Sequence, residues 1–323
     1  MKLALRSFAL LALLVPAAVL SAGCEVKDCQ TDDGEDATCL ESLTHYADPM
    51  YNKQAEVDYV AGKNISINGV YGAIKVQEGV AGKVTATFAP FNWQSHNDEA
   101  QAYEQIRTNI DMVMEVDANE DVQVTTSRNG GGNGLGAEIT VLIPPEFSGT
   151  LLVNNDSDGP MNPGNIEIDS VAQATALQVS TDNLGDCRIN GAATVKSSNV
   201  VCSGEILLEH VSDSVIAQSS SDFTKDDVIV TIDAISDTST GGTITADAGN
   251  VQVTFPNTGN FAIDANVAGA GTVVPGTTPS TCMLTEAAGH ADVNCGNGGP
   301  IYNLAAGMDA DYAGMIVLAY PAQ

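Results

Sequence analysis

Short strand patterns led by a turn residue recur along this chain at intervals of about 20 residues. In each copy apolar side chains alternate with polar ones, which places one face of a strand in the interior and the other in water. Repetition at a fixed period indicates that strands of one kind stack on one another. Five consecutive copies span residues 164–253, and an earlier one occupies 72–76; in chain order they read GAIKV, GNIEI, GDCRI, GEILL, DDVIV and GNVQV.

Second strands fill the spaces between the glycine-led ones, among them ALQV, ATVK, SVIA and TITA. Each turn of the repeat therefore carries at least two strands joined by polar bends. We predict an all-β fold, a single-stranded β-solenoid or β-helix of ~20-residue repeats found mainly in 150–270. One helix is expected near 97–113, where Tyr103, Ile106 and Ile110 recur at helical spacing, and it should cap the edge of the first strands.

The first 23 residues have a basic start and then the apolar run FALLALLVPAAVL, as in a secretory signal. The run is short for a membrane span and is interrupted by Pro16. It ends in LSAGC, which resembles a bacterial lipobox and predicts that Cys24 is lipidated and becomes the mature N-terminus. Ordinary cleavage just before Cys24 is the alternative. We divide the chain into a lipoprotein-type signal peptide at 1–23, an acidic tether at 24–55 and a folded domain at 56–323.

Seven cysteines agree with export, because lipidation of Cys24 leaves an even set, and even sets in exported proteins favour disulfides. The candidate couples are Cys29 with Cys39, Cys187 with Cys202, and Cys282 with Cys295. The middle couple conflicts with simple stacking of repeats. Its two cysteines are offset by four residues in the repeat, which exceeds the ~7 Å between Cα atoms that a disulfide permits unless the strand bends. A metal site is not indicated, since the chain has no CxxC and its four histidines are scattered.

The charge balance is strongly acidic, with 12 basic and 41 acidic residues and a net charge of −29. No lysine or arginine follows Lys225. Such a field repels nucleic acid and anionic lipid, so we expect no nucleic-acid partner. We interpret the acidic residues mainly as a solvated exterior.

A β-helix polysaccharide-active enzyme is the main alternative function, and it would need clustered carboxylates and a basic side chain on one face. Beyond residue 140 the basic side chains are Arg188, Lys196 and Lys225. Arg188 alternates with inward-facing neighbours and should face solvent. Carboxylate pairs such as Asp226 with Asp227 arise by chance in so acidic a chain, and no catalytic motif is present. We therefore expect no catalysis and assign no catalytic, cofactor-binding or metal-binding residue.

A calcium-dependent binding module is a further alternative. The segment NNDSDGPMNPGN at 154–165 clusters the oxygen ligands that Ca²⁺ prefers. Its spacing matches no defined calcium loop, so a turn rich in Asn, Asp and Gly is the preferred interpretation. No cofactor is expected.

Several segments together resemble a family of exported bacterial proteins described as putative adhesins, related to auto-transporter adhesin head domains and built from short β-strand repeats. The segments are SINGVYGAIKV, TVLIPPEFSGTLLV, QVSTDNLGDCRI, VKSSNVVCSGEI and ITADAGNVQVTFP. The similarity covers about 56–323. It implies a repetitive β fold and, by analogy, adhesion, but the family pattern fixes no binding residue.

We expect an exported lipoprotein of the bacterial cell envelope, held at the outer membrane through Cys24 and acting as a structural or adhesive binding module. The membrane would be contacted through the lipid anchor. The ligand would be an envelope or extracellular molecule, and the sequence indicates neither its identity nor the oligomeric state.

Overall fold

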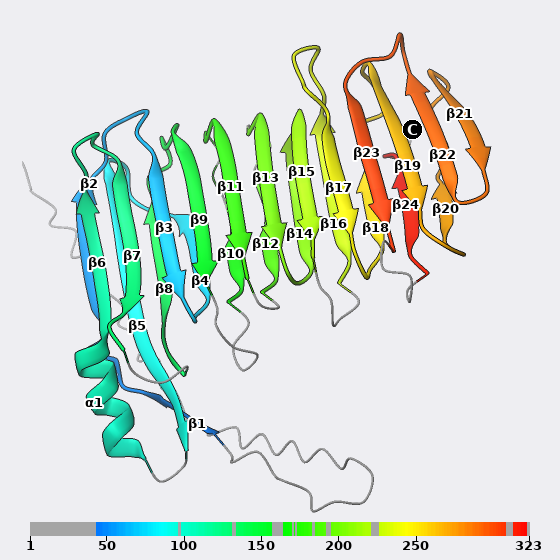
Figure 1. Ribbon diagram of the computed structural model, residues 1–323. Helices are drawn as coiled ribbons and strands as arrows, with labels where there is room; N and C mark the ends of the chain where they lie inside the picture. The colour runs from blue at the N-terminus through cyan, green and yellow to red at the C-terminus, as the bar shows by residue number, and fades with distance from the viewer. Residues whose placement is uncertain are drawn as a thin grey trace, which may run out of the picture.

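A computed structural model describes residues 43–95, 98–130, 134–156, 164–169, 171, 173–182, 185–191, 195–220, 226–307 and 313–321. Within these residues the chain forms two 12-stranded β-sheets, one α-helix and one short 3-10 helix. The two sheets, which we call sheet A and sheet B, lie face to face, with sheet B nearer the viewer in Figure 1 and sheet A behind it. The apolar core is the layer between them. No helix in the described part of the chain is long and apolar enough to cross a membrane.

Sheet A holds strands from the whole length of the chain, in the order β1-β5-β8-β4-β10-β12-β14-β16-β18-β24-β20, with β2 also paired to β5. Their bounds are β1 Leu43–Ala47, β2 Lys53–Asp58, β4 Ile74–Glu78, β5 Lys83–Ser95, β8 Leu135–Ile143, β10 Ile166–Ile168, β12 Cys187–Ile189, β14 Ile206–Ser212, β16 Val228–Ala234, β18 Val251–Thr254, β20 Thr272–Pro275 and β24 Met315–Ala319.

Sheet B has the order β21-β22-β19-β23-β17-β15-β13-β11-β9-β3-β7-β6. Its strands are β3 Ile65–Val70, β6 Ile110–Val116, β7 Val122–Arg128, β9 Thr150–Asp156, β11 Ala176–Thr181, β13 Ser197–Cys202, β15 Ser214–Ser219, β17 Gly242–Ala246, β19 Phe261–Val267, β21 Cys282–Ala287, β22 His290–Cys295 and β23 Ile301–Ala306.

The middle of the molecule is built from the glycine-led repeats. From β9 to β18 the chain alternates between the sheets, and each strand from β9 to β16 pairs in parallel with the strand two further along. The alternation of apolar positions keeps this register, because a slip by one residue would turn every inward side chain to water. In sheet A the first inward position forms a buried column of Ile74, Ile166, Cys187, Ile206, Val228, Val251 and Ile316.

The expectation of a single-stranded β-solenoid is wrong, although the all-β class is correct. The chain forms two large mixed sheets whose strand order departs from chain order at both ends. β3 and β4 pair with β9 and β10 across the long intervening segment, and β17 pairs with β23. Antiparallel hairpins close both ends of sheet B. A single period describes only the middle strands, because the ends must pair or cover edges that the repeat leaves exposed.

The expected helix is present as α1, Glu99–Asn109. Its buried Ile106 packs in a small separate apolar cluster with Ile110, Leu135 and Ala137. The amide oxygen of Gln105 accepts hydrogen bonds from Asn92 Nδ2 and Gln94 Nε2 of β5, both at 2.7 Å. The helix therefore packs beside the long strand β5, below the sheets in Figure 1. The short 3-10 helix, Pro49–Tyr51, lies between β1 and β2.

The segment assigned as a tether overlaps ordered structure. β1 pairs antiparallel with β5, in the register Leu43 with Ser95, and β2 pairs with the other part of the same strand. The signal peptide, Cys24, Cys29 and Cys39 lie outside the described residues.

A ladder of side chains follows the leading turn residue of each repeat. Asn165 Oδ1 accepts a hydrogen bond from Asp186 N at 2.9 Å, and Asp186 Oδ1 accepts one from Glu205 N at 2.9 Å. The pattern returns where Asp227 Oδ1 accepts from Asn250 N at 2.9 Å and Asn250 Oδ1 accepts from Met315 N at 3.0 Å. Each side chain thus satisfies a backbone N–H of the neighbouring strand, where the chain enters sheet A.

The leading glycine is required by a close approach. A Cβ atom at Gly249 would collide with the backbone oxygen of Asp226, and one at Gly185 would collide with Thr181 Oγ1. Buried polar side chains at the same corner donate hydrogen bonds to the backbone oxygens of other leading glycines. Asn155 Nδ2 donates to Gly164 O at 2.8 Å, and Ser219 Oγ donates to Gly204 O at 3.0 Å.

Two of the expected cysteine couples are disulfides. Cys187 of sheet A joins Cys202 of sheet B with Cα atoms 6.3 Å apart. The offset between stacked repeats does not apply, because the bond crosses the interior from one sheet to the other. Cys282 joins Cys295 across the β21–β22 hairpin, where the two are register partners with Cα atoms 4.0 Å apart.

Candidate binding face on sheet B

The outward side of sheet B carries rows of side chains that run across the strands. One row follows the register through every strand from β6 to β21. Its members are Glu115, Gln123, Ser66, Leu152, Gln178, Asn199, Ile216, Thr243, Asn303, Asp264, Asp292 and Thr285. Because parallel register places equivalent positions side by side, the row is continuous across strands about 4.8 Å apart.

The central part of this row is uncharged in a strongly acidic protein. The seven adjacent strands from β3 to β23 present hydroxyls, amides and apolar side chains outward, the latter including Ile216 and Ile301, and Asp156 at the end of β9 is the one ionisable side chain among them in the described residues. With 41 acidic residues in the chain, carboxylates are concentrated elsewhere. We call this surface the neutral face.

Two shallow depressions lie on the neutral face and meet at Asn199. The first is lined by Ser197, Ser198, Asn199, Ser214, Ile216, Thr240, Gly241, Gly242, Thr243, Ile301 and Asn303. The second is lined by Ser66, Asn68, Leu152, Val153, Asn154, Gln178, Val179, Ser180, Asn199 and Val201. The linings of the two depressions together reach from β3 to β23, and we call the two depressions the groove. The strands that carry them lie at the front of Figure 1.

Some polar groups of the groove bond to one another, and others are available. Ser180 Oγ donates to Asn154 Oδ1 at 2.8 Å, which fixes the middle of the second depression. The exposed side chains of Gln178, Asn199 and Asn303 make no hydrogen bond with the described part of the chain. These amides can both donate to and accept from a ligand.

The outward side of sheet A has a different chemistry. Lys75 Nζ lies 3.0 Å from Glu167 Oε2, and this hydrogen bond raises the pKa of Lys75. His210 Nδ1 lies 3.1 Å from Asp233 Oδ2. Charged pairs of this kind on sheet A contrast with the neutral face of sheet B.

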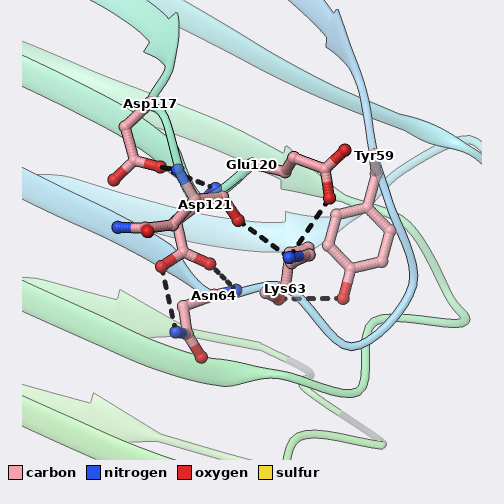
Figure 2. A network of polar contacts seen from close by, with 7 residues as sticks. Tyr59, Lys63, Asn64, Asp117, Glu120 and Asp121 are labelled. Carbon is pink, nitrogen blue, oxygen red and sulfur yellow. Dashed lines mark hydrogen bonds and ion pairs between the residues drawn. The ribbon is translucent and has the colours of Figure 1, made fainter.

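The N-terminal end of sheet B is held by a polar network (Figure 2). Lys63 Nζ donates to Asn119 O at 2.8 Å and pairs with Glu120 Oε2 at 3.2 Å. Asp121 accepts from Asn64 N at 2.8 Å and from Asn64 Nδ2 at 3.2 Å. Since Asn64 Oδ1 also accepts from Thr150 N at 2.9 Å, the network fixes β7, β3 and β9 at the points where they begin.

The residues considered as candidates for catalysis do not lie close together. Arg188 lies on the outward side of sheet A, where its side chain is 62% exposed and 3.9 Å from Glu205. Lys196 is exposed and directly precedes β13 of sheet B. Asp227 belongs to the side-chain ladder, and Lys225 lies outside the described residues. Of the three basic side chains beyond residue 140, the two that the structure describes, Arg188 and Lys196, therefore lie in or next to different sheets.

The segment considered for calcium binding, 154–165, lies only partly within the described residues, which omit 157–163. Of its described members, Asn155 is fully buried, and its Nδ2 donates to Gly72 O at 2.6 Å and Gly164 O at 2.8 Å. This side chain holds a corner between the sheets and does not face solvent.

The groove residues were not singled out by sequence reasoning. Gln178, Asn199 and Thr243 each stand at an outward position of an alternating strand, where a polar side chain is the ordinary solvated case. The available signal was the absence of charge at these positions, which contrasts with the composition of the whole chain.

Comparison with known proteins gives limited similarity. No family model matches the chain, and no curated protein matches it. Among solved structures, a putative cell adhesion protein from Clostridium sporogenes is 12% identical, with a TM-score of 0.34, over 83% of this chain and 99% of that one. A putative adhesin from Bacteroides fragilis is 12% identical, with a TM-score of 0.36, over 83% and 96%. A putative lipid binding protein from Parabacteroides distasonis is 10% identical, with a TM-score of 0.22, over 83% and 96%.

Two of these proteins carry the adhesin description that the sequence resemblance led us to expect. Identities of 10–12% and TM-scores of 0.22–0.36 assign this chain to no family.

Proposed function

We propose that the protein is an exported, non-catalytic binding module whose neutral face adheres to an uncharged, hydroxyl-rich polymer such as a neutral glycan. The observation that carries the proposal is the groove lined by uncharged amides, hydroxyls and apolar side chains on an otherwise acidic protein. Side-chain amides and hydroxyls exchange hydrogen bonds with water for hydrogen bonds with sugar hydroxyls without burying a charge.

The shape of the groove supports an extended ligand. Seven adjacent strands cross it, and six spacings of ~4.8 Å give a length of about 29 Å. Amides at Gln178, Asn199 and Asn303 recur along this length on separate strands. A polymer with a repeating pattern of hydroxyls can contact several of them at once, and linked weak contacts add up to useful avidity.

The charge of the protein supports selection against acidic polymers. A net charge of −29 repels nucleic acid and anionic polysaccharide at long range, whereas a neutral chain is not repelled. The proposal therefore includes no nucleic-acid partner.

Binding to immobilised neutral and anionic polysaccharides tests the proposal directly. The wild-type protein should bind a neutral glucan or mannan and fail to bind an anionic polymer at the same salt concentration. Asn199→Glu, which places a carboxylate where the two depressions meet, should weaken binding at least ten-fold. Gln252→Glu makes the same charge change on the outward side of sheet A and should have no effect. Equal losses in the two variants, or binding of anionic polymers alone, would contradict the proposal.

We also propose that Cys24 anchors the module to the envelope through a lipid. The support is the sequence LSAGC at the end of an apolar leader. Cys24→Ser should release the protein from membranes into the soluble fraction without changing its glycan binding. Retention of the variant on membranes would argue against the anchor and leave the binding proposal intact.

A further inference from the structure

Three potential metal ligands meet on the outward side of sheet B near its C-terminal edge. Asp264 comes from β19, and His290 and Asp292 come from β22. One nitrogen or oxygen atom from each lies within 4.8 Å of the other two, and all three side chains are half-buried. His290 Nε2 lies 3.1 Å from Asp292 Oδ2, and His290 Nδ1 lies 3.7 Å from Asp264 Oδ1.

The two carboxylates are brought together by strand register. Asp264 and Asp292 are direct partners in the antiparallel β19–β22 pair. Like charges directly opposite each other destabilise a sheet, so this pairing needs a positive charge close by. The chain contains no lysine or arginine after Lys225, and His290 is the one basic side chain in contact with the pair among the described residues.

The opposite end of sheet B shows how the same problem is solved with a lysine. There the acidic β6–β7 turn has the ammonium of Lys63 beside Glu120 Oε2 and Asn119 O (Figure 2). The C-terminal group has carboxylates in comparable number and an imidazole in place of the lysine. Imidazole and carboxylate together are typical ligands of transition metals, whereas an ammonium cannot bind a metal ion.

The histidine is also oriented as a ligand requires. Its Nδ1 lies 2.8 Å from Asn266 Oδ1, and Asn266 Nδ2 donates to Asp264 Oδ1 at 2.5 Å. If Nδ1 carries the proton and donates to Asn266, the unprotonated Nε2 faces Asp292. A hydrogen bond from the second ring nitrogen to an oxygen acceptor is the usual way in which a protein fixes a metal-binding histidine.

We propose that Asp264, His290 and Asp292 bind a divalent first-row transition-metal ion such as Mn²⁺ or Zn²⁺. Bonds of ~2.0–2.2 Å keep the ligands of such an ion within about 4.4 Å of one another, so only a small adjustment of side chains is needed. Three protein ligands leave further positions for water or for a ligand oxygen. Ca²⁺ fits less well, because it prefers six to eight oxygen ligands.

The proposed metal site lies beside the groove and is independent of glycan binding. Asn303, which lines the groove, is the register partner of Asp264 on β23. A metal ion here would place a positive charge at one end of the neutral face. The site would stand even if the face bound no glycan, since its ligands are all outside the groove.

Titration with Mn²⁺ followed by NMR of the histidine rings tests the site in the chelator-treated, full mature chain. Mn²⁺ is paramagnetic and prefers oxygen ligands to thiolate sulfur. With four histidines in the chain, the ring signals can be followed one by one. Substoichiometric Mn²⁺ should broaden the signals of His290 and leave those of His210 sharp. Calorimetry with Mn²⁺ and Zn²⁺ should give one site per chain.

Two variants and a matched control decide the result. D264N/D292N and H290Q should each weaken Mn²⁺ binding at least ten-fold, and their outward side chains allow the fold to be checked by thermal melting. H210Q removes the histidine that faces a single carboxylate, Asp233, on sheet A and should leave the affinity unchanged. No broadening of His290, unchanged affinity in D264N/D292N, or stronger binding of Ca²⁺ than of Mn²⁺ would each overturn the proposal.

Discussion

Sheet B ends in an antiparallel hairpin on each side, and the two ends are stabilised by different means. At the N-terminal end, β6 and β7 are joined by an acidic turn in which Glu120 pairs with Lys63, and the described residues there contain no disulfide. At the C-terminal end, β21 and β22 are joined by Cys282–Cys295, while Asp264 and Asp292 face each other without a lysine. The two ends therefore differ, because a lysine lies at the turn of one hairpin and a disulfide joins the strands of the other.

The largest expected effect comes from removing the covalent bond at the C-terminal end. Cys282→Ala with Cys295→Ala should lower the free energy of unfolding by about 2–4 kcal/mol, because the disulfide restricts the unfolded chain. Hydrogen exchange should show lost protection in β21 and β22, while β6 and β7 remain protected. Equal loss at both ends would mean that the hairpins are not independent in stability.

A smaller effect is expected from alkaline pH, and it should also arise at the C-terminal end. Burial raises the pKa of Tyr302 to about 12, and the pKa of Tyr320 to about 12 as well. A raised pKa means that the unfolded chain releases the proton first, so this stability is complete below pH ~10 and is lost as pH rises toward 12. By pH ~11.5 the buried Tyr302 should cost about 2 kcal/mol, and the half-buried Tyr320 should cost less because solvent screens its charge.

Thermal melting between pH 9 and 11.5 measures this loss. Tyr302→Phe cannot ionise at that position, so its melting temperature should fall less over the same range than that of the wild type. At neutral pH the variant loses the hydrogen bond that the Tyr302 hydroxyl donates to Asp213 O and should be less stable. A parallel pH dependence in the two proteins would contradict the assignment to Tyr302.

At the N-terminal end, Lys63→Gln removes the lysine from the acidic β6–β7 turn. The turn then has no lysine beside its carboxylates, as is the case for Asp264 and Asp292. The variant loses the pair with Glu120 and the hydrogen bond to Asn119 O, and about 1 kcal/mol of unfolding free energy should be lost. Lys83→Gln is the control, because Lys83 pairs with exposed Glu56 and Asp58 and its removal should give no measurable change in melting temperature. Equal shifts in the two variants would remove the special role of Lys63.

The converse substitution supplies a lysine to the C-terminal end. Asn266→Lys places an ammonium beside Asp264 and should raise the unfolding free energy of the metal-free protein by about 0.2–1 kcal/mol through relief of the carboxylate repulsion. The same change should abolish Mn²⁺ broadening of His290. Gln252→Lys on sheet A controls for overall charge. An Asn266→Lys protein that still binds Mn²⁺ would show that the lysine and the ion do not compete.

The strands of the middle region follow from the sequence, and their arrangement follows only in part. The glycine-led copies became β10, β12, β14, β16 and β18, because period-two alternation determines which side chains can face a core. The adjacency of β4 and β10 could not be read from the period, since the chain between them forms five strands and a helix before it returns. The residues of GAIKV do not themselves indicate which later strand will pair with β4.

The side-chain ladder was visible in the sequence and was not recognised. The second residue of the five consecutive copies is Asn165, Asp186, Glu205, Asp227 and Asn250. Attention to the apolar positions concealed this column, although short polar side chains beside a tight turn commonly bond to nearby backbone. The Cys187–Cys202 bond conflicts with a single stack of repeats, but it fits two facing sheets because it crosses from one sheet to the other.

The proposed metal ligands could not be predicted from spacing. Asp264 and Asp292 are far apart in the chain, and their contact depends on the antiparallel register of β19 with β22. That register pairs β19 with a strand that follows β20 and β21 in the chain, and the repeat does not predict such an antiparallel pairing. His290 was one of four scattered histidines until the strands placed it beside both carboxylates.

The pairing of β3 and β4 with β9 and β10 has a consequence for how the chain reaches its fold. During synthesis or export these two early strands emerge long before β9 and β10, so one edge of each stays unpaired until residues near 150–168 arrive, while the other edge can pair earlier with β7 or β8. The same delay in strand pairing occurs at the other end, where β17 emerges well before its partner β23. Contacts between residues so distant in sequence slow folding. A waiting edge is also a template for wrong pairing, so aggregation of truncated chains should begin at β3 and β4.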